Sequence, residues 1–416
     1  MDDAAIASIV GCHDQAEACP EEQVRRDDMT MIVDQPTRAT TDRLNRQTLE
    51  QRAIDAAGLT DFGDLPLDGL DVLIFALERE AQLDAPRRAG AAAMITGALV
   101  KRLKLVEDRK RFPGIADERI EAPIFIVGLP RTGSTNLHGL MAQCEGIRAP
   151  RRWEMSLPSP PPEATCYDSD PRIAQVHAAE VAGASAELQK RHPITADRPE
   201  QCQSLNDHVF MNWALLAPFD IPSYRDWLLT ADHRPSYEAH RRTLQHLQHR
   251  HPGRWVLKYP KHVFALDALI ATYPDARLIW THRDPAKTLP SVASLIGTFR
   301  SATPGYDPQL LGRSWCAFEE IGLRRGLDMR DQLFDAGRVY DMQYRDVMRD
   351  PVEAISDAYG HFGETLSDAS RDRIGAYLAD NAKDKHGAHH YTAEEYGLSD
   401  AVLRSTFRDY IDRFGV

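Results

Sequence analysis

The chain has few cysteines, and their spacing excludes two classes of small protein. Its 416 residues include six cysteines, scattered along the length without a CxxC pair. This pattern fits neither a disulfide scaffold nor a zinc site of ordinary spacing. We therefore expect reduced thiols, most of them structural.

Long apolar runs are also missing, which argues against a membrane span. The longest purely apolar window, Ala91 to Val100, has about half of the roughly 20 residues that a spanning helix needs. The opening stretch MDDAAIASIV carries acids where a secretory signal would carry Lys or Arg. We expect a cytoplasmic protein.

The chain has fewer basic residues than acidic ones. There are 50 Lys and Arg against 62 Asp and Glu, a net charge of −12, and the isoelectric point is near 5.7. Proteins that coat nucleic acid need a basic face that releases counterions, so nucleic acid is not an expected partner. A local basic pocket remains open, and 43% hydrophobic residues can build a large core.

The texture of the sequence divides the chain into three parts. Residues 1–45 lack periodicity and are expected to form a tail or arm. Residues 46–115 repeat apolar side chains at helical spacing. Residues 116–416 are expected to form an α/β domain, in which a segment rich in Pro and aromatic residues, about 152–252, is inserted as a helical cap over the acceptor.

Short apolar strands alternate with helices in the third part. The predicted strands are Ile124–Val127, Trp255–Lys258, Arg277–Thr281 and Arg338–Met342. The predicted helices are His262–Thr272, Ala286–Phe299, Ser314–Phe334 and Pro351–Phe362. Such alternation predicts a P-loop-like, three-layer α/β/α fold around a central parallel sheet.

One turn carries a phosphate-binding pattern. GLPRTGST, Gly128 to Thr135, has the spacing of the P-loop GxxxxGK[ST] between a strand and a helix. Amides of such a loop and the helix N-terminus favour an anion. Ser134 stands where a nucleotidase has its lysine, which makes an ATPase or GTPase less favoured, and Arg131 restores positive charge.

Three motifs resemble sulfotransferases that use 3′-phosphoadenosine 5′-phosphosulfate (PAPS). PIFIVGLPRTGST resembles the 5′-phosphosulfate loop of the bacterial branch, and WVLKYPKHVFALDALIATYPDARLIWTHRDPAKTLPSVASL resembles the family's strand, helix, strand, helix block. DNAKDKHGAHHYTAEEYGLSDAVLRSTFRDYIDRFGV resembles its closing segment. The resemblance covers about residues 121–416 and leaves the first hundred or so residues poorly constrained.

The resemblance implies a set of residues that bind the nucleotide. The 5′-phosphosulfate would lie on the loop, and the 3′-phosphate on an Arg that follows a strand and a Ser eight residues later; basic residues of the closing segment would cover the nucleotide. In chain order these are Gly128, Arg131, Thr132, Gly133, Ser134, Thr135, Arg283, Ser291, Lys385 and His386.

Sulfuryl transfer also needs help for the leaving group and a base. Arg131 and Lys258, at the end of a strand, are expected to stabilise charge on the sulfonate and the bridging oxygen. The leaving group is a stable nucleotide phosphate, so no metal is required. Glu200 is the preferred base for the acceptor; His262 is the second candidate, because the position of the family's catalytic His is Pro260 here.

The acceptor is expected to be a small, apolar molecule, a lipid or a glycolipid with a hydroxyl or amine group. Aromatic residues of the insertion could line its pocket; they are Trp153, Phe210, Trp213, Phe219, Tyr224 and Trp227. The product would be 3′-phosphoadenosine 5′-phosphate (PAP), and a homodimer is a family-level expectation.

The sequence also permits two other functions, and it contains one cluster of histidines. An atypical P-loop kinase or nucleotidase would hold Mg²⁺ on a carboxylate at a strand, for which Asp341 is the candidate. A noncatalytic nucleotide-binding module is the other alternative. The histidines of HLQHRH, His246, His249 and His251, are interpreted as a solvated helix face.

Overall fold

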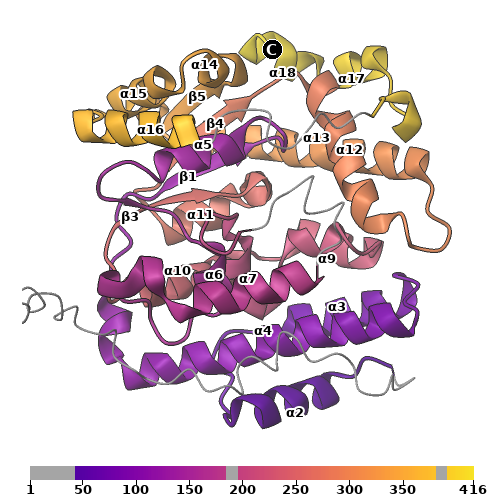
Figure 1. Cartoon of the computed structure of the whole chain (residues 1–416). Coiled ribbons are helices and arrows are strands. Elements are labelled where there is room, and N and C mark those ends of the chain that lie inside the picture. Colours follow the sequence, from indigo (N-terminus) through magenta and orange to yellow (C-terminus); the bar gives the residue numbers. More distant parts are fainter. Residues whose placement is uncertain (1–42, 184–194, 381–390) are drawn as a thin grey trace, which may run out of the picture.

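A five-stranded parallel sheet runs through the centre of the molecule (Figure 1). The structure is a computed structural model that describes residues 43–183, 195–380 and 391–416; the predicted tail lies almost wholly outside this range. The strand order is β2-β3-β1-β4-β5. The strands are β1 Ile124–Gly128, β2 Ile147–Arg148, β3 Arg254–Lys258, β4 Arg277–His282 and β5 Val339–Gln343.

The sheet is buried on both faces. Along β1, Phe125 and Val127 point into the larger hydrophobic core, whereas Ile124 and Ile126 point into a second core on the opposite side. A strand covered on both faces has no polar side, which explains its continuous apolar sequence. Helices form both covering layers, so the predicted three-layer α/β/α fold is confirmed.

The two helical layers differ in size. The smaller core contains side chains of α5 Ser134–Met141, α14 Tyr344–Arg349, α15 Pro351–His361 and α16 Asp368–Asp380. The larger one contains side chains of α10 Arg234–Gln248, α11 Leu266–Thr272, α12 Pro285–Arg300, α13 Pro308–Leu333, α17 Asp400–Thr406 and α18 Arg408–Phe414.

The amino-terminal helices form an outer layer, and their buried side chains belong to the larger core. They are α2 Arg46–Ala57, α3 Asp68–Arg79 and α4 Ala85–Arg111, and Figure 1 shows them on the side of the molecule opposite α14, α15 and α16. The buried Arg102 of α4 donates to the carbonyls of Phe62 (2.5 Å) and His208 (3.4 Å), which joins α4 to the inserted segment.

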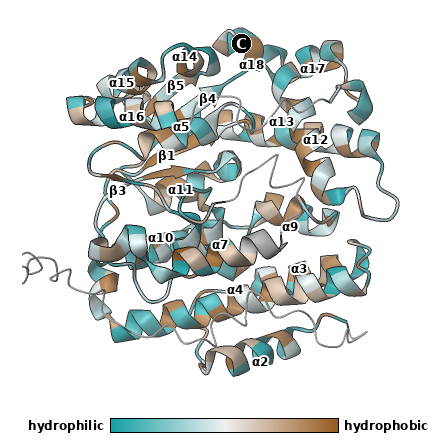
Figure 2. Ribbon diagram, in the orientation of Figure 1, coloured by the Kyte–Doolittle hydropathy of each residue, from teal (hydrophilic) through white to brown (hydrophobic). Residues whose placement is uncertain are grey.

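The described residues of the insertion between β2 and β3 form helices and 3₁₀ turns. These are α6 Arg152–Ser156, α7 Pro171–Gly183, α9 Pro222–Thr230 and α10, with 3₁₀ turns η2 Ala164–Ser169, η3 Cys202–Leu205, η4 Asp207–Val209 and η5 Trp213–Leu216. Figure 2 shows teal and brown residues mixed along the outer helices, as expected for elements that bury one face. No helix in the described part of the chain is long and apolar enough to span a bilayer.

Several predicted boundaries change for local reasons. Helix α13 begins at Pro308 instead of Ser314, because Asp307 accepts hydrogen bonds from the amides of Gln309 and Leu310 and caps the helix earlier. The predicted helix His262–Thr272 is split into the 3₁₀ turn η6 Pro260–Phe264 and α11. Strand β2 was not predicted, since two residues leave no alternation to read.

The cysteine prediction is wrong at one position. Cys144, Cys202 and Cys316 are free thiols, as expected. Cys166 is disulfide-bonded.

Candidate active site

The loop between β1 and α5 is shaped by two glycines. Gly128 has a φ of 120° and Gly133 a φ of 81°, values that L side chains rarely adopt. A Cβ atom on Gly128 would lie 2.6 Å from the Thr281 carbonyl oxygen, and one on Gly133 would lie 2.9 Å from the Tyr344 ring. The tight turn of this loop therefore requires glycine at positions 128 and 133.

Arg131 lies at the tip of this loop and is held from two sides. Its backbone has a φ of 66°, and its side chain is exposed. Nε donates to the hydroxyl of Ser291 (3.1 Å), while Nη1 of Arg283 donates to the Arg131 carbonyl (2.9 Å). The Arg283 guanidinium also stacks 4.1 Å above the Tyr344 ring. The structure thus brings together three residues that were predicted to bind the donor.

The hydroxyl residues of the loop divide into inward and outward groups. Thr132 is buried, and its Oγ1 donates to the Leu129 carbonyl (2.8 Å) and lies 2.7 Å from Oγ1 of Thr281, so its side chain fixes the turn. Ser134 is also buried. Thr135 is exposed and faces the strand β3.

Lys258, the last residue of β3, points toward the start of α5. Its Nζ lies 3.3 Å from Oγ1 of Thr135. Burial lowers the pKa of this ammonium to about 8; Glu200 and Cys202 oppose the shift, and the nearby charge of Arg131 adds to it. A cation with this pKa can give up a proton near neutral pH far more readily than an ordinary lysine.

Glu200 lies within electrostatic reach of Lys258. Its carboxylate accepts from Nη1 of Arg152 (3.0 Å) and from the Gln201 amide (2.7 Å), and its own amide donates to the Pro150 carbonyl (3.0 Å). These contacts tie Glu200 to the start of α6 and leave its side chain about 20% exposed. The carboxylate is therefore positioned and partly accessible.

His262 lies in the 3₁₀ turn η6 that follows Lys258, and it is buried. Nδ1 lies 2.7 Å from the Tyr237 hydroxyl and Nε2 lies 3.1 Å from Sγ of Cys202. Burial holds the pKa of this imidazole well below its ordinary value, with the nearby His240 contributing. His262 is 5% exposed, whereas the Glu200 side chain is 20% exposed, so His262 is less accessible to a substrate than Glu200 is.

One set of side chains among the described residues could hold a metal ion. Ligand atoms of Cys202, His240 and His262, all buried, lie within 4.8 Å of one another. Burial raises the pKa of the Cys202 thiol to about 12 and lowers that of His240 to about 3, so all three are uncharged at neutral pH. No local spacing in the sequence marks this set, because its members are far apart in the chain.

Comparisons with known proteins agree with this geometry. The model of the sulfotransferase family matches residues 123–368. This chain belongs to the sulfotransferase family. The match includes the loop at Gly128, the end of β3 and the Arg283 region, so the expected resemblance is confirmed at family level, and the chain is a transferase.

Mycobacterial sulfotransferases are among the relatives. Omega-hydroxy-beta-dihydromenaquinone-9 sulfotransferase Stf3 of Mycobacterium bovis and of Mycobacterium tuberculosis is 27% identical over 307 residues, which are 71% of this chain and 75% of the relative. The crystal structure of STF1 from Mycobacterium tuberculosis H37Rv has a TM-score of 0.79 at 31% identity and covers 89% of this chain and 100% of its own. STF9 from Mycobacterium avium has a TM-score of 0.83 at 27% identity, covering 91% and 98%.

The sulfotransferase site contains residues that the sequence did not single out. Tyr344 supports both Gly133 and Arg283, Thr281 supports the loop, and Arg152 binds Glu200. Each comes from a segment distant in the chain, and no local pattern marks it. Lys385 and His386, predicted to cover the nucleotide, lie outside the described residues.

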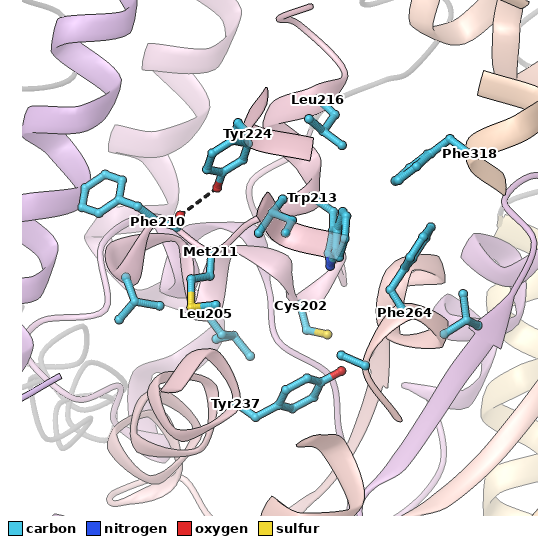
Figure 3. Packing of buried hydrophobic residues seen from close by; sticks show 14 of the residues in the cluster. Cys202, Leu205, Phe210, Met211, Trp213, Leu216, Tyr224, Tyr237, Phe264 and Phe318 are labelled. Carbon is cyan, nitrogen blue, oxygen red and sulfur yellow. Dashed lines mark hydrogen bonds between the residues drawn. The ribbon is translucent and has the colours of Figure 1, made fainter. Parts of the chain in front are cut away.

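Five of the six aromatic residues predicted to line the acceptor pocket are buried in the sulfotransferase core; they are Trp153, Phe210, Trp213, Phe219 and Tyr224. Figure 3 shows Trp213 and Phe264 stacked, with Phe318 beyond. The ring centroids of Trp213 and Phe264 are 4.5 Å apart, and those of Phe264 and Phe318 are 4.7 Å apart. The Tyr224 hydroxyl donates to the Phe210 carbonyl (2.7 Å). The Phe210 ring itself points away from this stack (Figure 3) and lines a cavity against α4.

His246 and Asp341 are both held by contacts within the protein. His246 is 2% exposed and 2.9 Å from the Pro158 carbonyl, so the interpretation of a solvated histidine face is wrong there. Asp341, the candidate Mg²⁺ ligand of a kinase, lies 2.7 Å from Nε2 of His282 and accepts from Nη1 (2.5 Å) and Nη2 (2.6 Å) of Arg330. Its carboxylate is engaged in holding β4 and α13 together.

Proposed function

We propose that this sulfotransferase moves the sulfuryl group of PAPS to a hydroxyl of a small apolar acceptor and releases PAP. The observation that supports this most is the cluster of Arg131, Lys258 and Arg283 around a glycine loop, in a chain whose net charge is −12. A local cationic site in an acidic protein suits a donor with several negative groups.

The donor would bind along the loop and the edge of the sheet. Backbone amides from Thr132 to Thr135, at the N-terminus of α5, would bind the 5′-phosphosulfate, because a helix N-terminus favours an anion. Arg283 and Ser291, joined through Arg131, would bind the 3′-phosphate.

Lys258 would act on the leaving group. In the transfer, the bond between sulfur and the bridging phosphate oxygen breaks, and a bond from sulfur to the acceptor oxygen forms. Negative charge grows on the PAP phosphate, where the Lys258 ammonium and Arg131 would stabilise it. Lys258 comes from β3 and contacts Thr135, so it reaches the same point as the loop.

Glu200 would take the proton of the acceptor hydroxyl. It is the carboxylate near Lys258 that is partly exposed, and Arg152 and the Gln201 amide hold its orientation. The insertion of residues 152–252, which carries Glu200, would form the cap over the acceptor. The lipid-like acceptor named for Stf3 supports an apolar acceptor for this chain.

Thermal denaturation with PAP or with ATP and Mg²⁺ tests the donor. A ligand at a hundred times its Kd stabilises a protein by about 2.7 kcal/mol. We expect PAP to stabilise the wild type and to have little effect on Arg283→Ala, while ATP with Mg²⁺ has little effect on either. A larger shift with ATP and Mg²⁺, or no shift with PAP, would contradict the proposal.

The base is tested in the same samples by turnover. Glu200→Gln keeps the size of the side chain and can still contact Arg152, so PAP should stabilise it as it does the wild type. We expect its kcat to fall by about 10² to 10⁴, the usual contribution of a general base. An unchanged kcat in Glu200→Gln would assign the proton to another group.

A further inference from the structure

A cavity lies between α4 and the insertion. It encloses about 390 Å³ and is lined by residues of α4, of the segment 156–159, of α7 and of η4 and η5. We call it the α4 cavity. Its size lies in the range of small-molecule sites, and no motif in the sequence of residues 46–115 pointed to it.

The wall of the α4 cavity is mainly apolar. Met94, Gly97 and Ala98 line it from α4, and Phe210 and Leu215 line it from the insertion. A Cβ atom on Gly97 would have no neighbour within 4 Å, so there is room for a larger side chain at this position of α4. Met94 is 36% exposed and lines the mouth of the cavity.

Two of the cations that line the cavity, Lys101 and Arg172, are paired within the protein. Nζ of Lys101 lies 2.6 Å from the Asp207 carboxylate and donates to the carbonyls of Met155 (3.2 Å) and Ser204 (2.9 Å). The Arg172 guanidinium pairs with Asp170 (2.7 Å). These groups therefore create no demand for a charged ligand.

The contacts of Lys101 also place the cavity next to the candidate active site. Met155 belongs to α6, which begins at Arg152, the partner of Glu200. Ser204 belongs to η3, which begins two residues after Glu200. One of the two segments that Lys101 contacts thus begins at the partner of Glu200, and the other begins two residues after Glu200.

The backbone of Phe210 is held in an unusual conformation that directs its ring into this cavity. Its φ is 56° and its ψ is 32°, a left-handed conformation that is strained for a bulky residue. The Tyr224 hydroxyl donates to its carbonyl, and α3 packs against the same carbonyl at Gly69. Surrounding structure therefore maintains the strain.

We propose that the α4 cavity binds the apolar chain of the acceptor, an extended hydrocarbon whose terminal hydroxyl reaches Glu200. The proposal rests on the proposed function, since the hydroxyl must meet the donor. Apolar walls, paired charges and an opening at Met94 suit an uncharged chain that is longer than the cavity. An acceptor with a terminal hydroxyl is also named for the relative Stf3.

Two matched glycine variants test the proposal. Gly97→Leu fills the cavity from α4, whereas Gly90→Leu places the same side chain on the same helix, where a Cβ also meets nothing within 4 Å but which does not line the cavity. Both changes improve helix propensity. The acceptors are 1-hexadecanol and 1-butanol, with PAPS as donor and PAP release as readout.

We expect Gly97→Leu to raise KM for 1-hexadecanol at least about tenfold, because each methylene kept out of the cavity weakens binding about fourfold. KM for 1-butanol and the stabilisation by PAP should not change, and Gly90→Leu should match the wild type. An equal effect on both alcohols, or none, would overturn the cavity assignment.

Binding without turnover separates this inference from the proposed function. Radiolabelled 1-hexadecanol is titrated into the wild type and both variants, and PAP binding is measured in parallel. Loss of 1-hexadecanol binding in Gly97→Leu alone supports the cavity even if PAP does not bind, in which case the proposed donor is wrong. Unchanged 1-hexadecanol binding in all three proteins, with PAP bound, rejects the cavity and leaves the donor intact.

Discussion

At the scale of single residues, Lys258 connects burial to the pH dependence of the reaction. Its pKa is lowered to about 8 from 10.5 mainly because its ammonium is buried. The folded protein holds this proton less tightly than the unfolded chain does, so the cost of burying the charge is present below pH 8. It is relieved as the pH rises from about 8 to about 10.5.

The proposed role of Lys258 requires its protonated form, which sets a basic limit on activity. We expect kcat/KM for PAPS, which reports the free enzyme, to fall as the pH rises through about 8. Lys258→Arg keeps its charge at every accessible pH, so its profile should stay level there, at a lower kcat. The pH profile of initial rates is the measurement, and a wild-type profile that is level beyond pH 9 contradicts the role.

Residues also show how far the sequence could predict the site. Gly128, Arg131 and Gly133 belong to one short loop between a strand and a helix, so their spacing alone predicts a phosphate site. Arg283 follows β4 by one residue and reaches the same edge, because parallel strands bring their carboxyl ends together. These predictions depend on local pattern and sheet topology only.

Other contacts depend on how distant segments pack, which no local pattern encodes. Arg152 meets Glu200 across the insertion, and Cys202 meets His262 from a different element. His246 was interpreted as solvated because its neighbours are polar, yet α10 buries it against the Pro158 carbonyl. Tertiary packing overrode composition in each case.

At the scale of elements, a buried ion pair fixes the turn that follows Lys258. Lys261 of η6 pairs with Glu319 of α13, and they are 8% and 2% exposed. The Lys261 ammonium also lies 4.8 Å from the centre of the Phe318 ring. The pair joins the strand that carries Lys258 to the longest helix on that face.

Removing one member of this pair should destabilise the fold more than removing both. Lys261→Met leaves a buried carboxylate without its cation, and we expect a loss of about 3–5 kcal/mol in the free energy of unfolding. Lys261→Met combined with Glu319→Leu should return close to the wild-type value. Urea denaturation measures both; a double variant no more stable than the single one would show that the pair itself is the stabilising feature.

At the scale of the whole molecule, Arg102 joins the amino-terminal helices to the insertion. Its guanidinium is 2% exposed and donates to carbonyls on both sides, including those of Phe62 and His208. Burial lowers its pKa to about 10, and the hydrogen bonds offset the cost of burying the charge. The outer layer and the α/β domain should therefore unfold together.

Replacement of Arg102 tests this cooperativity. Arg102→Met leaves several buried carbonyls without donors, and each such group costs about 1–3 kcal/mol. We expect one thermal transition, at a lower Tm than that of the wild type. Arg52→Met, at an exposed position of α2, should stay within about 0.5 kcal/mol of the wild type. Separate transitions for the two regions in the wild type would contradict a single unit.

The loop at Gly128 has a consequence for the heat of donor binding. Arg131, Ser291, Arg283 and Tyr344 already hold one another, and the Arg131 backbone is already in its left-handed conformation. The ordering of this loop is thus part of folding, and a bound nucleotide would lose little chain entropy on the protein side. Calorimetry should then find that donor association is dominated by enthalpy, with only a small unfavourable entropy.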